Sequence, residues 1–153
     1  MNKEFTIVMA SDHAGFELKE YLKSKLLKNN YKVEDVGCFS KEHVDYPDYI
    51  LKGAQVVGKN NNKYGVFICG TGIGASIVAN KVKNIRAALV YNKKTTILSR
   101  KHNNANVVVF GGRTISKCKA YKLLKLWLNT PFSNEERHQR RVKKISEIEK
   151  KIK

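Results

Sequence analysis

The sequence predicts a three-layer α/β/α fold in which helices cover both faces of a five-stranded parallel sheet. Five short apolar runs, continuous rather than alternating in polarity, are typical of strands buried on both faces. Segments with helical spacing separate these runs, and strand–helix–strand units of this kind produce parallel sheets. The chain has 153 residues, enough for one sizeable core, so we expect a single domain over residues 1–153.

The first half of the chain supplies strands and helices in alternation at residues 5–10, 14–28, 32–36, 47–58 and 64–69. Asn29-Asn30 ends the first helix and Gly37 ends the second strand. Pro47 suits the first turn of a helix, where a backbone N–H has no partner within the helix.

The second half continues the alternation at residues 75–81, 85–91, 95–103, 105–110 and 116–128. Gly111-Gly112 ends the fifth strand. Ser133 is expected to cap a final helix over residues 134–151, with Glu135 and Glu136 in its first turn, where the helix dipole favours acidic side chains.

Hydrophobic residues make up 42% of the chain, which is usual for a folded globular protein. No apolar stretch approaches the roughly 20 residues that a membrane span needs, and the first apolar run is too short for a signal peptide. Cys38, Cys69 and Cys118 are odd in number and far apart, so we expect free thiols and no zinc site. These features predict a cytoplasmic protein without membrane association.

The formal net charge of +17 raises the question of a nucleic-acid partner. Of the 30 basic residues, 24 are lysines, and they are dispersed along the chain together with 14 asparagines. A nucleic-acid-binding face would gather lysines on one side with aromatic residues for stacking. The dispersion favours a compositional bias of the solvated surface, so a basic nucleic-acid-binding protein is the weaker hypothesis.

The binding crevice of a parallel sheet lies outside the carboxyl ends of its strands. That rule selects four segments, residues 11–13, 69–74, 91–92 and 111–113. No acidic residue occurs between Asp48 and Glu135, so no carboxylate from the middle of the chain is available for the chemistry.

The loop after Cys69 has the features of an anion-binding turn. Its glycines let the backbone turn sharply and point several N–H groups into one concavity at a helix start, where a phosphate or an enediolate oxygen can bind. The same positive field favours the thiolate form of a cysteine. A thiolate beside an oxyanion cradle can abstract a proton alpha to a carbonyl.

The residues of this loop allow three other interpretations to be compared with an anion-binding turn. A cysteine at such a position is often just a small buried hydrophobe. A dinucleotide site would have glycines spaced GxGxxG and an acidic residue roughly 20 positions later, and both are missing here. A P-loop is excluded because no Lys-Ser or Lys-Thr follows the glycines.

A set of motifs covers almost the whole chain: Ser11-Asp12-His13-Ala14-Gly15-Phe16, Asp45-Tyr46-Pro47, Ile68-Cys69-Gly70-Thr71-Gly72-Ile73-Gly74, Ala79-Asn80-Lys81, Ile85-Arg86-Ala87, Ser99-Arg100-Lys101-His102-Asn103, Phe110-Gly111-Gly112-Arg113 and Arg137-His138-Gln139-Arg140-Arg141-Val142. With these motifs, in this order, the sequence resembles the ribose-5-phosphate isomerase B family, which includes galactose-6-phosphate and allose-6-phosphate isomerases. The resemblance implies a Rossmann-like fold. It also implies an aldose–ketose isomerase of the non-oxidative pentose phosphate pathway, which interconverts ribose 5-phosphate and ribulose 5-phosphate through ring opening and a cis-enediol(ate).

By this resemblance, Cys69 would be the base that moves a proton between C1 and C2 of the sugar. Some members carry a glutamate just after the glycine loop, whereas this chain has Ala75 there and resembles the cysteine-dependent branch. Thr71 would form a hydrogen bond near the transferred proton. The enediolate oxygen would be held by backbone N–H groups of Gly70, Thr71, Gly72, Ile73 and Gly74.

His102 would open the furanose ring by proton transfer to the ring oxygen, a task that suits an imidazole near neutral pH. Judged by position alone, a polar residue near a helix end is the favoured interpretation. Asn103 would position sugar hydroxyls. Asp12 would touch the ring oxygen or hydroxyls, cap the following helix, or do both.

The phosphate would be bound by Arg137 and Arg141, which lie four residues apart on one helix face and carry guanidinium groups suited to bidentate contact. His13 and Arg113 match further substrate contacts of the family. His138 and Arg140 fit the same motif without an assigned role. His43 is interpreted as a surface residue.

The resemblance also implies a homodimer whose sites take residues from both subunits, with a further pairing into tetramers left open. The substrate would be a small sugar phosphate, and the reaction needs neither a metal nor an organic cofactor. A six-carbon sugar phosphate is the alternative substrate, since pocket size decides between the two. A catalytically inactive scaffold is disfavoured because Cys69 and His102 are both present.

Overall fold

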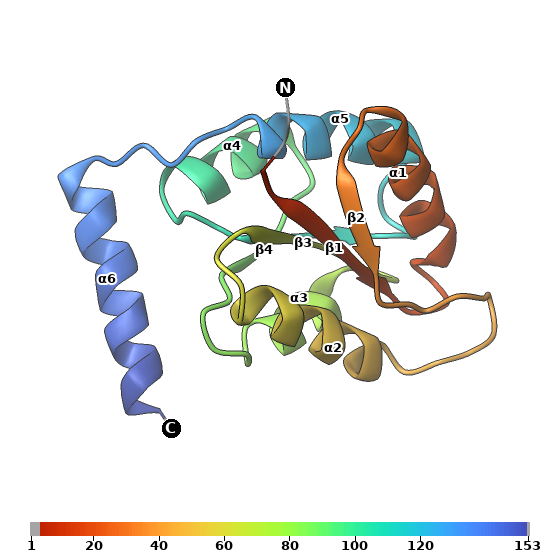
Figure 1. The fold of residues 1–153 in the computed structure, drawn as a ribbon, viewed down its shortest axis with the longest axis horizontal. Helices are drawn as coiled ribbons and strands as arrows, with labels where there is room; N and C mark the ends of the chain where they lie inside the picture. The colour runs from red at the N-terminus through yellow and green to blue at the C-terminus, as the bar shows by residue number, and fades with distance from the viewer. Residues whose placement is uncertain (1–3, 153) are drawn as a thin grey trace.

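The structure, a computed structural model that describes residues 4–152, confirms the predicted three-layer α/β/α architecture (Figure 1). One five-stranded sheet has the strand order β2-β1-β3-β5-β4, and every strand pair is parallel. The strands are β1 (Thr6–Ser11), β2 (Lys32–Asp35), β3 (Lys63–Cys69), β4 (Ala87–Leu89) and β5 (Val107–Gly111).

Helices cover both faces of the sheet, as Figure 1 shows. One layer contains α1 (Phe16–Lys28), α4 (Lys93–Lys101) and α5 (Lys117–Leu128), and the other contains α2 (Tyr46–Gly58) and α3 (Ile73–Ala79). Neighbouring strand residues alternate between the two cores. Ile68 packs in the core under α1 and α5, whereas Phe67 and Cys69 pack in the core under α2 and α3.

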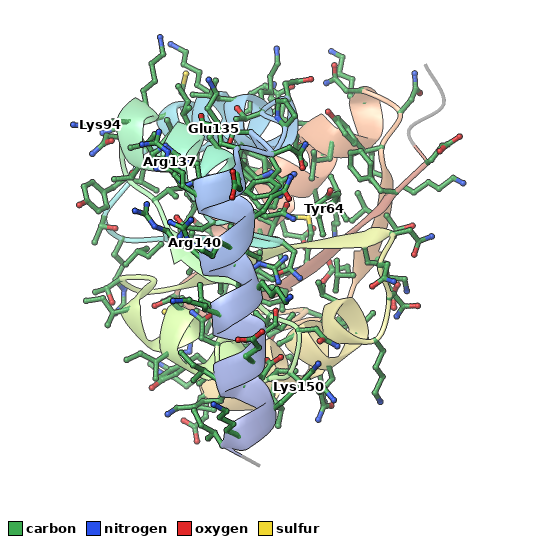
Figure 2. The ribbon with its side chains drawn as sticks, turned by 90° about the vertical axis from the view of Figure 1, so that its left-hand side faces the viewer. Tyr64, Lys94, Glu135, Arg137, Arg140 and Lys150 are labelled. Atoms are coloured by element: carbon green, nitrogen blue, oxygen red, sulfur yellow. The ribbon has the colours of Figure 1, made fainter. Side chains whose placement is uncertain are left out.

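The last helix, α6 (Glu136–Lys151), stands to one side of these layers (Figure 1). Figure 2 shows Glu135 and Arg137 at its start and Lys150 near its other end. Ile145 and Ile148 on this helix are 42% and 55% exposed, and His138 is its buried residue. Helix α6 therefore leaves an apolar face open within the described chain.

Several predicted boundaries shift for identifiable reasons. Strand β4 was expected over residues 85–91 but is confined to Ala87–Leu89. At its start, the N–H of Arg86 donates to the side chain of Asn106 instead of a strand partner. The final helix does not begin after Ser133, whose N–H donates to Lys101 O. Asn134 then has φ +56°, a left-handed conformation that a helix cannot include, so α6 begins at Glu136.

Within residues 4–152 we find no helix that combines the length and the apolar character needed to cross a bilayer.

Candidate active site

Three loops meet at the carboxyl ends of β1, β3 and β5. The N–H of Gly112 donates to Cys69 O at 2.8 Å, and the N–H of Arg113 donates to Gly70 O at 2.9 Å. The N–H of Asp12 donates to Ile68 O at 3.3 Å. Strands β1 and β3 flank the point where the strand order changes direction, which is where parallel α/β sheets bind ligands.

Glycine is required where these loops touch. A Cβ on Gly111, at the end of β5, would lie 2.6 Å from Thr71 O in the loop after β3, and Gly72 in that loop has φ +81°. A Cβ on Gly112 would lie 2.5 Å from Ala14 O, although this residue has an ordinary φ. Any side chain would force the loops apart, so the glycines of the motifs keep the three loops interlocked.

Cys69 lies at the base of this junction, 4% exposed, at the last position of β3. Ala75 is fully buried in the same apolar cluster. The position at which some relatives of the predicted family carry a glutamate is thus filled by a methyl group. All three cysteines are free: Cys38 is buried like Cys69, and Cys118 is exposed.

Asp12 and His13 follow β1 directly into the junction. Asp12 is 6% exposed, and its Oδ1 accepts the N–H of Gly15 at 2.9 Å. This bond closes the turn before α1. The N-cap of α1 is Gly15, so Asp12 is not the predicted N-cap but stabilises the turn that precedes the helix. His13 Nδ1 lies 3.2 Å from both the backbone O and N of Val44.

Three more side chains border the glycine loop. Thr71 is exposed, and its hydroxyl accepts the N–H of Ile73 at 3.3 Å. Arg113 lies over Gly70, where an added Cβ would come within 3.5 Å of the guanidinium Nη1. Tyr46 lies against Gly74, where an added Cβ would meet the phenol ring at 2.6 Å.

Tyr46 and His43 were not identified as site residues from the sequence. Tyr46 belongs to the motif Asp45-Tyr46-Pro47, and this membership is the sequence feature that points to the site. His43 is exposed as expected, but its ring centroid lies 4.3 Å from that of His13. Nothing in the spacing of two histidines thirty positions apart indicates such a contact, because the intervening loop decides it.

In the same chain, His102 and Asn103 lie at the amino ends of the strands, on the side of the sheet opposite to the loop after Cys69. Helix α4 starts at the carboxyl end of β4 and runs back, so its C-cap, His102, lies near the start of β5. Arg113 follows the opposite end of β5. The five residues of β5 separate the two edges by about 13 Å at roughly 3.3 Å per residue. One chain therefore does not bring Cys69 and His102 together.

Arg137 and Arg141 lie on the His102 side. Both are exposed, and Arg137 Nε donates to Glu135 Oε2 at 2.9 Å. His138, between them in sequence, is 2% exposed and stacks on His102, with ring centroids 4.1 Å apart and planes inclined by 13°. A second cluster of predicted site residues thus forms at the amino edge of the sheet.

Arg100 belongs to the same motif as His102, but its side chain packs inside the protein. It is 8% exposed, and its guanidinium carbon lies 5.2 Å from the ring centroids of both Tyr64 and Trp127. Its Nε donates to Thr130 O at 3.1 Å. Arg100 thereby ties the end of α4, and with it His102, to the core and to the segment after α5.

Burial lowers the pKa of His138, and the neighbouring His102 and Arg137 act in the same direction, while Glu135 opposes them. The unfolded chain binds a proton at this histidine near its ordinary value of 6.5, whereas the native state stays neutral to lower pH. Unfolding below that pH therefore takes up a proton. The neutral, buried ring contributes stability above the ordinary pKa, and this contribution is lost as the pH falls.

We expect the free energy of unfolding to decrease more steeply in wild type than in His138→Phe when the pH falls from about 7.5 to about 5.5. Phenylalanine fills the site without a titrating group, so the difference between the two slopes isolates His138 from the carboxylates. Urea unfolding at a series of pH values measures both slopes. Equal slopes would show that His138 does not titrate differently in the folded and unfolded states.

Within residues 4–152 no group of three or more His, Cys, Asp or Glu side chains is arranged to hold a metal ion.

Fold and site define a parallel α/β protein with a buried thiol at the binding edge of its sheet and a histidine–arginine cluster at the other edge. The chain belongs to the Ribose/Galactose Isomerase family, whose model matches residues 7–145. This confirms the family membership that the motifs predicted.

Relatives match over nearly their full length. Ribose-5-phosphate isomerase B of Escherichia coli is 38% identical, covering 95% of this chain and 97% of that protein. The structure of ribose-5-phosphate isomerase B from Clostridium thermocellum is 43% identical, with a TM-score of 0.94 and coverage of 97% and 100%. The enzyme from Mycoplasma genitalium, solved with bound ribulose-5-phosphate, is 40% identical, with a TM-score of 0.91 and coverage of 95% and 97%.

Proposed function

We propose that this chain is an aldose–ketose isomerase that interconverts ribose 5-phosphate and ribulose 5-phosphate. The observation that carries the proposal is the thiol of Cys69, which ends β3 where the three glycine-containing loops interlock. A relative of 40% identity and the same fold was solved with ribulose-5-phosphate bound. The free thiols of the chain fit a reducing compartment, which supports a cytoplasmic enzyme.

In this proposal the thiolate of Cys69 removes the C2 proton of open-chain ribose 5-phosphate. The C2–H electron pair becomes the C1–C2 double bond, and the carbonyl pair moves onto O1, which gives a cis-enediolate. Cys69 returns the proton to C1, while the O2 proton passes to O1 and the C2 ketone forms. Backbone N–H groups of residues 70–74 stabilise the charge on oxygen, with the Thr71 hydroxyl close to the transferred proton.

Ring opening precedes this step, and His102 supplies the proton to the ring oxygen. Asn103 and Asp12 hold sugar hydroxyls. The phosphate binds to Arg137 and Arg141, whose exposed guanidinium groups are available to an anion. His13 and Arg113 make further substrate contacts from the carboxyl edge.

Such a site requires two chains, because Cys69 and His102 of one chain lie at opposite edges of the sheet. The proposed enzyme is therefore a homodimer, in which the carboxyl ends of the strands of one chain face His102 of the other chain. Between α6 and β4 lies a pocket of about 560 Å³. Its lining includes the exposed apolar side chains of Ile145 and Ile148 on α6 and of Ile152, the C-cap of that helix. An open apolar face beside an edge strand supports association of two copies.

Initial rates with ribose 5-phosphate, allose 6-phosphate and galactose 6-phosphate, assayed side by side, test the proposed substrate. We expect kcat/KM for ribose 5-phosphate to exceed that for either hexose phosphate by about tenfold or more, since a pocket built around one chain length discriminates against an added carbon by roughly 10- to 200-fold. A higher kcat/KM for a hexose phosphate would contradict the pentose assignment while leaving the chemistry intact. No turnover of any of the three would contradict the isomerase itself.

A further inference from the structure

Helix α6 is attached to the body of the protein through few groups. The N–H of Asn84 donates to Glu149 Oε1 at 2.8 Å near the end of the helix. At its start His138, its one buried residue, stacks on His102. Because Arg137 and Arg141 flank His138 in sequence, this contact determines where the two arginines stand relative to the His102 ring.

In the described part of the chain, hydrogen bonds do not hold the His138 ring in place. Among the described residues, neither Nδ1 nor Nε2 of His138 has a hydrogen-bond partner. The nearest carboxylate oxygen, Glu135 Oε2, lies 3.9 Å from Nε2, which is too long for a hydrogen bond. With no hydrogen bond to hold it, the His138 ring is placed by burial and by its stack on His102, and a ring of similar size without polar atoms could make the same stack.

We propose that His138 is a positioning residue for the isomerisation: its ring fixes the plane of the His102 imidazole and couples it to the arginine-bearing start of α6. The inference rests on the proposed function, in which His102 opens the sugar ring and Arg137 and Arg141 bind the phosphate. Through this stack, the ring-opening group and the phosphate-binding groups keep one relative position.

The charges around the pair support this role. His102 approaches from the end of α4, Glu135 precedes α6, and Arg137 and Arg141 lie on α6 itself. Burial, His102 and the arginines all lower the pKa of His138, and only Glu135 raises it. The lowered pKa of His138 favours its neutral form in the stack, where His102 is the half-buried ring of the pair.

The test separates ring opening from enolisation. Ribulose 5-phosphate cannot close a five-membered ring, because its C5 oxygen carries the phosphate. Exchange of its C1 hydrogen with deuterated water therefore requires enolisation but no ring opening. Conversion of ribose 5-phosphate, which is a furanose in solution, requires both steps.

We expect His138→Ala to lower kcat for ribose 5-phosphate about tenfold and to raise its KM, while C1 exchange at saturating ribulose 5-phosphate changes by less than about twofold. His138→Phe restores the stack and should recover kcat to within about threefold of wild type. Val142→Ala, an apolar truncation one turn along α6, is the matched control and should change neither rate by more than about twofold. In a His102→Ala background, His138→Ala should cause no further loss of kcat for ribose 5-phosphate.

An equal loss of both rates in His138→Ala would overturn the positioning role, as would the same losses in Val142→Ala, or additive losses with His102→Ala. NMR measurement of the order of the His102 side chain in the free protein does not depend on activity. That side chain should be ordered in wild type and His138→Phe and averaged in His138→Ala; unchanged order in His138→Ala would overturn the inference. Absence of ribose 5-phosphate turnover in wild type would instead contradict the proposed function.

Discussion

Cys69→Ala should leave a folded protein that still binds the sugar phosphate but isomerises ribose 5-phosphate roughly a thousandfold more slowly than wild type, because a positioned base is worth that order of rate. The thiol is 4% exposed at the end of β3, and its truncation removes one atom from an otherwise intact cluster. Cys69→Ser keeps the shape and a hydrogen-bonding group but offers a hydroxyl in place of a thiolate, so it should be similarly slow.

The variants need two readouts. Circular dichroism and binding of ribose 5-phosphate by calorimetry establish that fold and affinity persist, and initial rates give kcat. Cys69→Ala should also abolish C1 exchange in ribulose 5-phosphate, since no base remains to remove the proton. Cys38→Ala is the matched control, because Cys38 is equally buried and donates to Ser40 O outside the glycine loop.

A near-wild-type kcat for Cys69→Ala would contradict Cys69 as the base. The carboxylate of Asp12 would then be the next candidate, since it is buried at the same edge of the sheet. In the structure its Oδ1 accepts the N–H of Gly15, which commits it to the turn before α1.

The order of the elements was predictable because it depends on local patterns. The apolar run that ends at Cys69 and the glycines after it specify a buried strand and a sharp turn, and both are present. Boundaries were less predictable where a side chain replaced a backbone partner. Asn92 accepts the N–H of Thr95 through its side chain, so α4 begins at Lys93 instead of Thr95.

The position of β4 was not predictable from the alternation. Five alternating units fit several strand orders, and in the one observed β4 lies outside β5 at the edge of the sheet. The side chain of Asn80 bonds both the N–H and the C=O of Ala87, which occupies part of that edge. Such contacts depend on tertiary packing that no local pattern encodes.

The division of the candidate site was, in contrast, contained in the order of elements. A helix that joins two parallel strands runs back from the carboxyl edge to the amino edge. His102 ends such a helix and Cys69 ends a strand. Within one chain, the two must therefore lie at opposite ends of the strands, His102 at the amino ends and Cys69 at the carboxyl ends. The stack of His102 on His138 was not accessible in this way, because α6 follows the last strand and no rule of strand pairing constrains its place.

A heterodimer of Cys69→Ala with His102→Ala should recover about half of the wild-type ribose 5-phosphate isomerase activity, although each homodimeric variant is nearly inactive. In the proposed dimer, each site takes Cys69 from one chain and His102 from the other. The mixed dimer then contains one site with both lesions and one site with none. Two affinity tags, applied in sequence after refolding of mixed chains, isolate the mixed species for assay.

The matched control pairs Cys69→Ala with Cys69→Ser, which places both lesions in the same half of the site and should recover nothing. If each site were built within one chain, Cys69→Ala with His102→Ala would leave no intact site, and the mixed dimer would be as inactive as its parents. Recovery in the first pair without recovery in the second therefore requires a site shared between two chains. A wild-type protein that sediments as a fully active monomer would refute the shared site directly.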